Sequence, residues 1–463
     1  MFPPSTYKTH RELLKKLCGT GILLFPGNSE ESYNYPANCY PFRQDSNFLY
    51  FFGISQPGLA GLLDTDQNQD ILFREDSDPE DMIWTGPVAG ASVLQEMSGT
   101  DQCLPFQEIC SYLQRALRDG RKVHFLPPYR PSTQHQLLNW LGIPPAQQKE
   151  QSSEALSRGV IHLRSIKSEE EIQEIEKASE VSTRMHRTVM KMACPGITEQ
   201  AIAGMLEGIA LSAGCRVSFP PIVSMRGEIL HNHDHSGILE EGKLLLTDAG
   251  CETAMGYAAD ITRTVPVGGV FSMKQKDIYS IVQAMSKKTI PLATPETPYR
   301  TVHWEACKIM VEGLCLLGLM KGNPEEAVEA GAHALFMPHG IGHMMGLDVH
   351  DMEGLGEDLV GYDEEIPRNK LFGHASLRMG RRLKPGMVVT HEPGIYFIPG
   401  LIEQWKTLKK HAEYIHYERI EDYMDFGGIR IEDNLLITPD GNRILGPPLP
   451  KTIKSIEKAM KHS

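Results

Sequence analysis

Two short apolar stretches, each carrying one aspartate, constrain the fold of this chain more than any other feature. The segment TDAGCETAMGYAADITR (residues 247–263) places Asp248 at the end of one stretch and Asp260 at the start of the next. On neighbouring β-strands, directly opposed residues have β-carbons about 5 Å apart. Two carboxylates that close repel each other unless a cation or a shared proton lies between them. The segment therefore indicates paired strands with a cation site, and two ordinary turn aspartates are the alternative.

Two later strand-like segments each add a glutamate. In GMVVTHEPGIYF, Glu392 ends an apolar run, and in GGIRIEDNLLIT, Glu432 lies inside one. Glutamate is unfavourable inside a strand, so Glu432 requires either an exposed edge or a ligand role. A lone histidine is more often a core or surface residue, but MPHGIGHMMGLDVHD places His339, His343 and His350 within twelve positions, among glycines that allow close backbone approach. This clustering indicates a functional loop.

The four carboxylates and one of these imidazoles form an oxygen-rich donor set with some nitrogen. Such a set suits manganese, cobalt or zinc, and it is large enough for two ions. Two metal ions about 3.5–4 Å apart can together activate a water for attack. The donor set therefore predicts a dinuclear hydrolytic site.

The chain is too long, at 463 residues, for one ordinary hydrophobic core. Its first part, residues 1–155, is predicted to be a smaller α/β domain. The polar stretch AQQKEQSSEALSRG (residues 146–159) is predicted to be the linker, and residues 156–463 the second domain. The strands predicted in the first domain lie in TGILLFPGN, GLAGLLDTDQNQDILF (a hairpin) and RKVHFLPP, and its clearest helix lies in EICSYLQRALRDG.

Helices and strands are mixed in the second domain, which predicts an α+β fold. Ser168 with Glu171 forms the pattern of a capping box, and so does Ser272 with Gln275. The first of these helices should stop at the CPG tripeptide, and further helices are expected over residues 198–214 and 299–318.

Composition excludes several classes of function. A net charge of −13 argues against a nucleic-acid-binding protein, which would carry a basic stripe. No run approaches 18 apolar residues and no apolar leader is visible, so we expect a cytoplasmic protein that does not span a membrane. The nine cysteines show no C-x-x-C spacing, so neither a thiolate zinc site nor a disulfide framework is indicated.

The order of the motifs DAG…DITR, PHGIGHMMGLDVHD, EPGIYF and GGIRIED resembles the proline-specific metallopeptidases of the pita-bread fold, aminopeptidase P and prolidase. The resemblance covers about residues 160–450. The segment YPFRQDSNFLYFFGI is also similar to the amino-terminal domain of aminopeptidase P. The resemblance implies a hydrolase that binds two divalent metal ions, manganese first, with cobalt or zinc as alternatives. The metal ligands that it implies are Asp248, Asp260, His343, Glu392 and Glu432.

The same resemblance implies roles for residues around the metal ligands. Glu392 would also be the general base, and His350 would polarise or protonate the scissile bond. His339 would line the pocket for the proline, and His231 would stabilise the reacting carbonyl unless it is a solvated surface histidine. Arg430 would support the ligand cluster from outside, and Thr262 would do the same.

The substrate implied is a peptide with proline in its second position, from which the enzyme removes the first residue. The alternative is a dipeptidase, because Arg378 matches a prolidase arginine that binds the free carboxylate of a dipeptide. An ordinary surface arginine also explains Arg378. A remote alternative is a binding protein of the same fold that has lost catalysis.

Trp84, in IWTG, resembles an aromatic residue that a neighbouring subunit contributes to the active site in these enzymes. The resemblance therefore implies a homodimer or homotetramer. Tryptophan is also common in hydrophobic cores, which is the simpler explanation of Trp84. The mixed charged and aromatic segment at residues 400–426 either rims the cleft or packs on a partner subunit.

Overall fold

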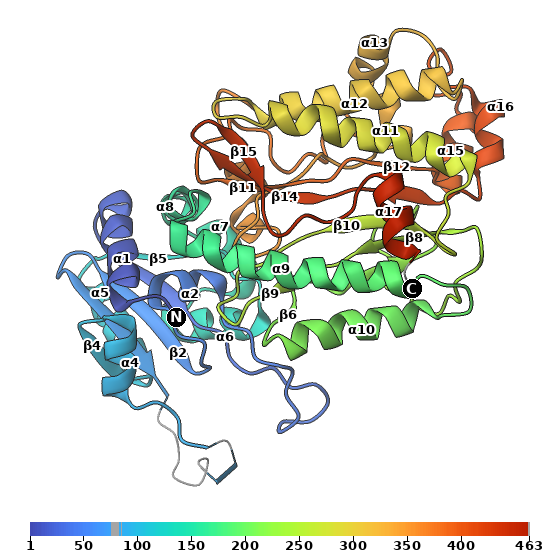
Figure 1. The fold of residues 1–463 in the computed structure, drawn as a ribbon. Coiled ribbons are helices and arrows are strands. Elements are labelled where there is room, and N and C mark those ends of the chain that lie inside the picture. Colours follow the sequence, from blue (N-terminus) through green and yellow to red (C-terminus); the bar gives the residue numbers. More distant parts are fainter. Residues whose placement is uncertain (76–82, 85, 462–463) are drawn as a thin grey trace. The chain divides into compact units, whose positions relative to one another are not determined.

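The computed structural model describes residues 1–75, 83–84 and 86–461 (Figure 1). The chain divides into two compact units. The amino-terminal unit comprises Met1–Arg164 and Glu353–Gly356, and the carboxy-terminal unit comprises the rest.

The amino-terminal unit is built on a five-stranded sheet with the strand order β4-β3-β2-β1-β5. β2 and β3 form the hairpin that their sequence predicts, with Leu59 opposite Arg74, whereas β5 joins β1 in parallel. The elements are β1 Ile22–Pro26, β2 Leu59–Asp64, β3 Gln69–Arg74, β4 Gln102–Pro105, β5 Val123–Phe125, α1 Pro4–Cys18, α2 Ser46–Phe52, α4 Ala91–Ser98, α5 Glu108–Arg118, α6 Pro131–Leu141, α7 Pro145–Gln151 and α8 Glu154–Ser165.

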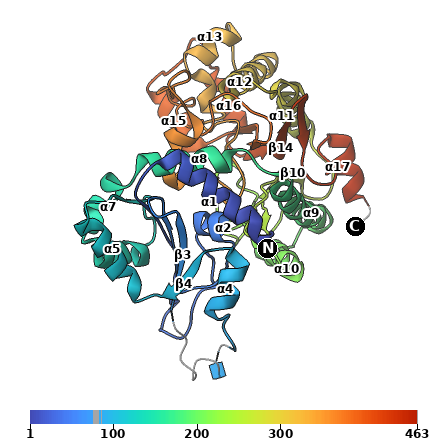
Figure 2. The same ribbon diagram turned by 90° about the vertical axis from the view of Figure 1, so that its left-hand side faces the viewer.

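Both faces of this sheet are covered by helices. Alternate strand residues such as Leu24, Leu62 and Phe73 pack with Leu113 of α5 and Trp140 of α6, as a side-chain period of two requires. Figure 2 shows β3 and β4 between α5 on one side and α1 with α2 on the other. The prediction of an α/β domain is therefore confirmed by its layers.

The stretch predicted as a linker is helical. Residues 146–159 lie almost entirely in α7 and α8, which a break of two residues separates. Its glutamines, glutamates and alanines are good helix formers, and this propensity prevails over the polar composition that suggested a linker. The boundary predicted between residues 155 and 156 lies inside α8.

A buried arginine ties three elements of the amino-terminal unit together. Arg11 of α1 is fully buried, and its Nε lies 2.8 Å from Oδ2 of Asp70 on β3. Its guanidinium also donates to the carbonyl oxygens of Phe51 at 2.7 Å, Ser98 at 3.0 Å and Gly99 at 2.8 Å. One side chain thus satisfies the carbonyls at the ends of α2 and α4, which have no partner within their own helices.

The carboxy-terminal unit contains several small sheets. Their strand orders are β10-β8-β7, β11-β14-β15, β12-β13 and β6-β9. The strands are β6 Arg216–Val217, β7 Ile222–Ser224, β8 Leu244–Asp248, β9 Cys251–Glu252, β10 Thr262–Pro266, β11 Val388–His391, β12 Gly394–Tyr396, β13 Gly428–Arg430, β14 Asp433–Thr438 and β15 Gly441–Ile444.

Helices lie on both sides of these strands. Figure 1 shows β8, β10 and β14 between the pair α9 and α10 and the pair α11 and α12. The capping boxes predicted at Ser168 and Ser272 are both formed, and they start α9 and α11.

No helix in the described ranges combines the length and apolar character that a membrane crossing requires. The helices are α9 Glu169–Met192, α10 Glu199–Ser212, α11 Met273–Thr289, α12 Tyr299–Leu316, α13 Pro324–Glu329, α14 Glu357–Gly361, α15 Pro399–Thr407, α16 Tyr417–Ile420 and α17 Ile453–Met460.

The strand pairing around the acidic residues differs from the simplest expectation. Asp248 ends β8 as predicted, but it lies opposite Thr262, because Asp260 comes two residues before β10 begins. Glu432 does not lie inside a strand. It occupies the break between β13, which pairs with β12, and β14, which pairs with β11, and its amide donates to the Thr262 carbonyl at 3.0 Å. This position removes the conflict with the low strand propensity of glutamate.

The segment at residues 400–426 packs on its own unit. Ile402 and Trp405 of α15 are buried, and the Trp405 ring lies 6.1 Å from the Phe372 ring. Tyr423 stacks on Phe397 at 4.7 Å. These contacts account for two of the aromatic residues of the segment, Trp405 and Tyr423.

We predict that Arg11→Met weakens the amino-terminal unit by about 3–5 kcal/mol, because it leaves three carbonyls and Oδ2 of the buried Asp70 carboxylate without their donor, while Lys15 still pairs with Oδ1 at 3.0 Å. Hydrogen exchange of the β1 and β2 amides measures this unit separately. The matched control is Lys8→Met on the exposed face of the same helix, which should change protection by less than about 0.5 kcal/mol. Equal effects of the two substitutions would contradict the prediction.

Candidate metal centre

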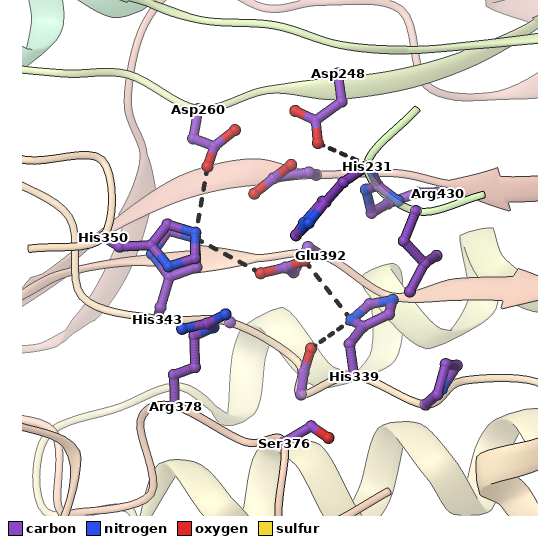
Figure 3. Close-up of a pocket in the computed structure, with 15 residues that line it drawn as sticks. His231, Asp248, Asp260, His339, His343, His350, Ser376, Arg378, Glu392 and Arg430 are labelled. Carbon is purple, nitrogen blue, oxygen red and sulfur yellow. Dashed lines mark hydrogen bonds and ion pairs between the residues drawn. The ribbon is translucent and has the colours of Figure 1, made fainter. Parts of the chain in front are cut away.

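One cavity of about 280 Å³ in the carboxy-terminal unit collects the residues that the motifs singled out (Figure 3). They come from strand ends and from loops that are far apart in the sequence. The lining residues that were predicted are His231, Asp248, Asp260, His339, His343, His350, Arg378, Glu392, Arg430 and Glu432. The arrangement of these side chains therefore decides what the cavity can bind.

Three of the predicted ligands converge tightly. Asp260, His343 and Glu432 are buried, and one donor atom of each lies within 4.8 Å of the other two. Nε2 of His343 is 3.5 Å from Oδ2 of Asp260 and 3.7 Å from Oε1 of Glu392. The Glu392 side chain is 19% exposed, which makes it more open to the cavity than Asp260. Figure 3 shows Asp260 and Glu392 directed toward the His343 ring.

Close backbone contact brings His343 to this position. The His343 amide donates to Oγ1 of Thr390 at 3.1 Å, and the Thr390 amide donates to the His343 carbonyl at 2.9 Å. A β-carbon on Gly342 would lie 2.0 Å from the Thr390 carbonyl oxygen, so only glycine fits there. Nδ1 of His343 lies 2.9 Å from the Met344 carbonyl, which can only accept. Nδ1 therefore carries the proton, and Nε2 offers its lone pair to the cavity.

Two aspartate oxygens at this site are buried without a partner. Oδ1 of Asp248 and Oδ1 of Asp260 lack a hydrogen-bond donor within the described residues. Buried polar atoms in native structures are normally paired, so each of these oxygens requires an explanation. A divalent cation that prefers oxygen and imidazole ligands would supply it.

The electrostatics lead to the same conclusion. Burial, followed by the nearby carboxylates of Asp248 and Glu392, raises the pKa of Asp260 well above its usual value. Burial, followed by Asp260 and Glu392, does the same to the pKa of Glu432. Carboxylates crowded in this way cannot all ionise unless positive charge is added. The donor set therefore fits divalent metal ions.

One arginine supports the cluster from behind. Nη2 of Arg430 donates to Oδ2 of Asp248 at 2.7 Å, and its Nε donates to Oγ1 of Thr262 at 3.0 Å. The Thr262 hydroxyl in turn donates to Oε2 of Glu432 at 2.6 Å. Arg430 and Thr262 thus orient two of the predicted ligands.

Tyr396 is a site residue that the motifs did not single out. Its hydroxyl accepts from Nη1 of Arg430 at 2.7 Å and lies 2.9 Å from Nε2 of His339. Because arginine can only donate, the tyrosine proton points to Nε2 of His339, and the imidazole proton is on Nδ1. That Nδ1 faces the Gly340 carbonyl at 2.7 Å and Oε2 of Glu392 at 3.7 Å. In the sequence, Tyr396 could have been suspected only from the general rule that the hydroxyl of a buried tyrosine needs a hydrogen-bond partner.

Two further histidines complete the cavity wall. The His350 ring stacks on His343, with the ring centroids 3.9 Å apart and the planes at 23°. His231 lines the cavity with an exposed side chain, and partial desolvation there, followed by the charge of Arg430, lowers its pKa. A neutral imidazole at His231 can donate one hydrogen bond to a substrate oxygen.

Arg378 and Ser376 form the rim opposite the strands (Figure 3). Arg378 is 37% exposed, and its Nη1 lies 3.3 Å from Oε2 of Glu357. Ser376 was not predicted from the sequence. Trp84 does not line this cavity and is 84% exposed within the amino-terminal unit. Its contribution to the active site of another subunit stays a prediction.

The chain resembles known proteins over nearly its whole length. It matches the description "Metallopeptidase family M24" over residues 173–439 and "Aminopeptidase P, N-terminal domain" over residues 7–124. A probable Xaa-Pro aminopeptidase of Coccidioides posadasii is 31% identical over 458 residues, covering 95% of this chain and 92% of that protein. The Xaa-Pro aminopeptidase of Escherichia coli is 33% identical over 434 residues, covering 91% of this chain and 89% of that protein.

The likeness extends to three dimensions. Zinc-substituted E. coli aminopeptidase P, solved in complex with product, superimposes with a TM-score of 0.81 at 30% identity, covering 100% of this chain and 99% of that chain. The predicted fold, a pita-bread domain preceded by a smaller α/β domain, is thereby confirmed. The chain belongs to metallopeptidase family M24 and carries the amino-terminal domain of aminopeptidase P.

Proposed function

We propose that the protein is a Xaa-Pro aminopeptidase, a hydrolase that removes the first residue from peptides with proline in second position. The observation that carries this proposal is the convergence of Asp248, Asp260, His343, Glu392 and Glu432 on one cavity. Two buried carboxylate oxygens there have no other described partner. Relatives named Xaa-Pro aminopeptidase match more than nine-tenths of the chain.

These five side chains would hold two divalent metal ions. When bound, the ions would act as Lewis acids toward the scissile carbonyl oxygen and would make a water acidic enough to attack at neutral pH. Carboxylates with one imidazole suit manganese, and cobalt or zinc are the alternatives.

Glu392 is our candidate for the general base. Thr390 Oγ1 donates to its Oε1 at 3.3 Å, which leaves Oε2 to take a proton from the attacking water and return it to the leaving nitrogen. Nδ1 of His339, protonated because Tyr396 fixes its tautomer, faces this Oε2 and would hold it in place. His231 and His350 would donate to the reacting carbonyl and to the scissile bond.

The preference for proline rests on the relatives, and the chemistry of the leaving group explains why a dedicated site is useful. A prolyl nitrogen has no N–H and a fixed φ, so a site that recognises an ordinary amide by its N–H does not bind it productively. A dipeptidase is the second candidate, because Arg378 at the rim presents a guanidinium suited to the free carboxylate of a dipeptide. We favour the aminopeptidase. The cytoplasmic location, the dimer or tetramer, and the absence of a nucleic-acid partner stay predictions.

Asp260→Asn should lower kcat/KM at least about a thousandfold, since it removes a ligand from ions that contribute several kcal/mol to catalysis. Metal content, measured by plasma mass spectrometry after dialysis against a chelator and re-addition of Mn²⁺, should fall in parallel. Asp440→Asn, at an exposed position, is the control and should retain both. Undiminished hydrolysis by Asp260→Asn would remove the two-metal mechanism.

Thr262→Val should weaken metal binding about 10–100-fold, because the Glu432 ligand loses its donor and Arg430 loses its acceptor. Thr262→Ser keeps the hydroxyl and should remain close to the wild type. The Mn²⁺ concentration that gives half-maximal activity measures the effect. A valine variant with wild-type Mn²⁺ affinity would show that this hydrogen bond does not position the ligand.

Peptide length separates the two candidate activities. The aminopeptidase should cleave Xaa-Pro-Xaa tripeptides, and Arg378→Gln should affect that reaction by less than about tenfold, since the guanidinium then has no free carboxylate to bind beside the prolyl residue. The assay compares kcat/KM for a tripeptide and for the matching Xaa-Pro dipeptide. Cleavage of the dipeptide alone, lost in Arg378→Gln, would establish the dipeptidase instead.

A further inference from the structure

A second cluster of metal-binding side chains lies in the carboxy-terminal unit, apart from the catalytic cavity. Helix α12 carries His303 and Cys307 one turn apart, so both side chains project from the same helix face. His333 lies on the short 3₁₀ helix Ala332–Leu335. One donor atom from each of His303, Cys307 and His333 lies within 4.8 Å of the other two.

A third imidazole joins this cluster from a loop. Nδ1 of His374 lies 3.3 Å from Nε2 of His303, and its Nε2 lies 3.1 Å from the Val328 carbonyl oxygen. Because a carbonyl only accepts, Nε2 of His374 carries the proton and Nδ1 presents its lone pair to the cluster. The His374 ring is held by Trp304, which stacks on it with centroids 5.1 Å apart and planes at 11°. A carbonyl that fixes the tautomer in this way is the usual outer partner of a histidine metal ligand.

The cluster is buried and incompletely satisfied. His303, Cys307, His333 and His374 are each at most 4% exposed. Neither ring nitrogen of His333 has a hydrogen-bond partner among the described residues, although one of the two must carry a proton. Leaving a buried polar group unpaired is unfavourable, so a fully buried imidazole with two unpaired nitrogens requires a reason.

The chemistry of these side chains differs from that of the catalytic cavity. Two imidazoles with one thiolate, and a third imidazole beside His303, are donors that suit zinc, whereas the catalytic set is rich in oxygen and contains no sulfur. A separate cavity of about 380 Å³ is lined by His303 and His374, which gives an ion a way in.

We propose that His303, Cys307 and His333, with His374 beside His303 as a further donor, form a structural site for Zn²⁺ or a similar cation, distinct from the catalytic centre. Binding replaces the thiol proton of Cys307, which leaves to solvent, with a sulfur–metal bond. The ion would link α12, the 3₁₀ helix at residues 332–335 and the loop at residues 371–376. His374 lies two positions before Ser376 and four before Arg378, so the ion would also anchor the segment that forms the rim of the catalytic cavity.

Cobalt tests the proposal without relying on activity. Only a thiolate ligand gives Co²⁺ an intense charge-transfer band in the near ultraviolet, and the catalytic donors include none. We expect the chelated Asp260→Asn protein to show this band after one equivalent of Co²⁺. Cys307→Ser in the same background should abolish it, while Cys315→Ser, two turns along α12 and outside the cluster, should retain it.

If Cys307→Ser does not fold, a second measurement tests the proposal. X-ray absorption of the unsubstituted protein loaded with zinc identifies the atoms bound to the zinc. A sulfur neighbour bound directly to about one third of the zinc at three equivalents supports the site. First shells of oxygen and nitrogen alone, with zinc bound, would overturn it, as would the absence of the cobalt band in Asp260→Asn. Loss of peptidase activity in any variant does not enter this test, so it stands or falls separately from the proposed function.

Discussion

The repulsion among carboxylates buried in one cavity is the constraint on which the rest of the carboxy-terminal unit depends. Asp260 and Glu432 are almost completely buried beside Asp248 and Glu392, and crowding raises the pKa of the first two. Arg430 contacts this set through a single ion pair, with Asp248. One guanidinium cannot balance four carboxylates in a medium of low dielectric constant. The fold is therefore complementary to cations, and the energy of binding them offsets the unfavourable arrangement of their ligands.

The strand pairing explains how such an arrangement is held. Glu432 lies where the chain leaves one strand pair for another, and its amide bonds to the Thr262 carbonyl. The hydroxyl of the same threonine bonds to the Glu432 carboxylate at 2.6 Å, so one residue fixes both the backbone and the side chain of a predicted ligand. Asp248 lies opposite Thr262 in the next strand and is held by Arg430. Rigid strand ends thus carry ligands that repel one another.

The four candidate carboxylates stand out in the sequence because each lies beside an apolar, strand-like run, whereas only the resemblance to the family distinguishes His343 from His339 and His350 in the glycine-rich loop. Tyr396 and Ser376 could not be predicted, since their roles depend on what folding places opposite them. Helix starts at Ser168 and Ser272 followed from local capping chemistry, which involves residues three positions apart. Strand register is set by pairing between strands, which the local sequence does not show. The sequence therefore suggested that Asp260 lies opposite Asp248, whereas Thr262 does. The polar segment at 146–159 is helical, which its composition did not reveal, because composition does not distinguish a polar helix from an irregular linker.

The contrast between the two donor clusters follows from what surrounds them. The catalytic set keeps Glu392 partly open to a cavity lined by histidines and an arginine, as a site must if substrate is to reach the ions. The cluster of His303, Cys307, His333 and His374 is closed, with its outermost ring covered by Trp304. Buried imidazoles and a thiolate that substrate does not reach are the arrangement of structural zinc sites. The sequence did not reveal this cluster because Cys307 lies one helical turn from a histidine, His303, and not near a second cysteine. A search for the C-x-x-C spacing overlooks that pattern.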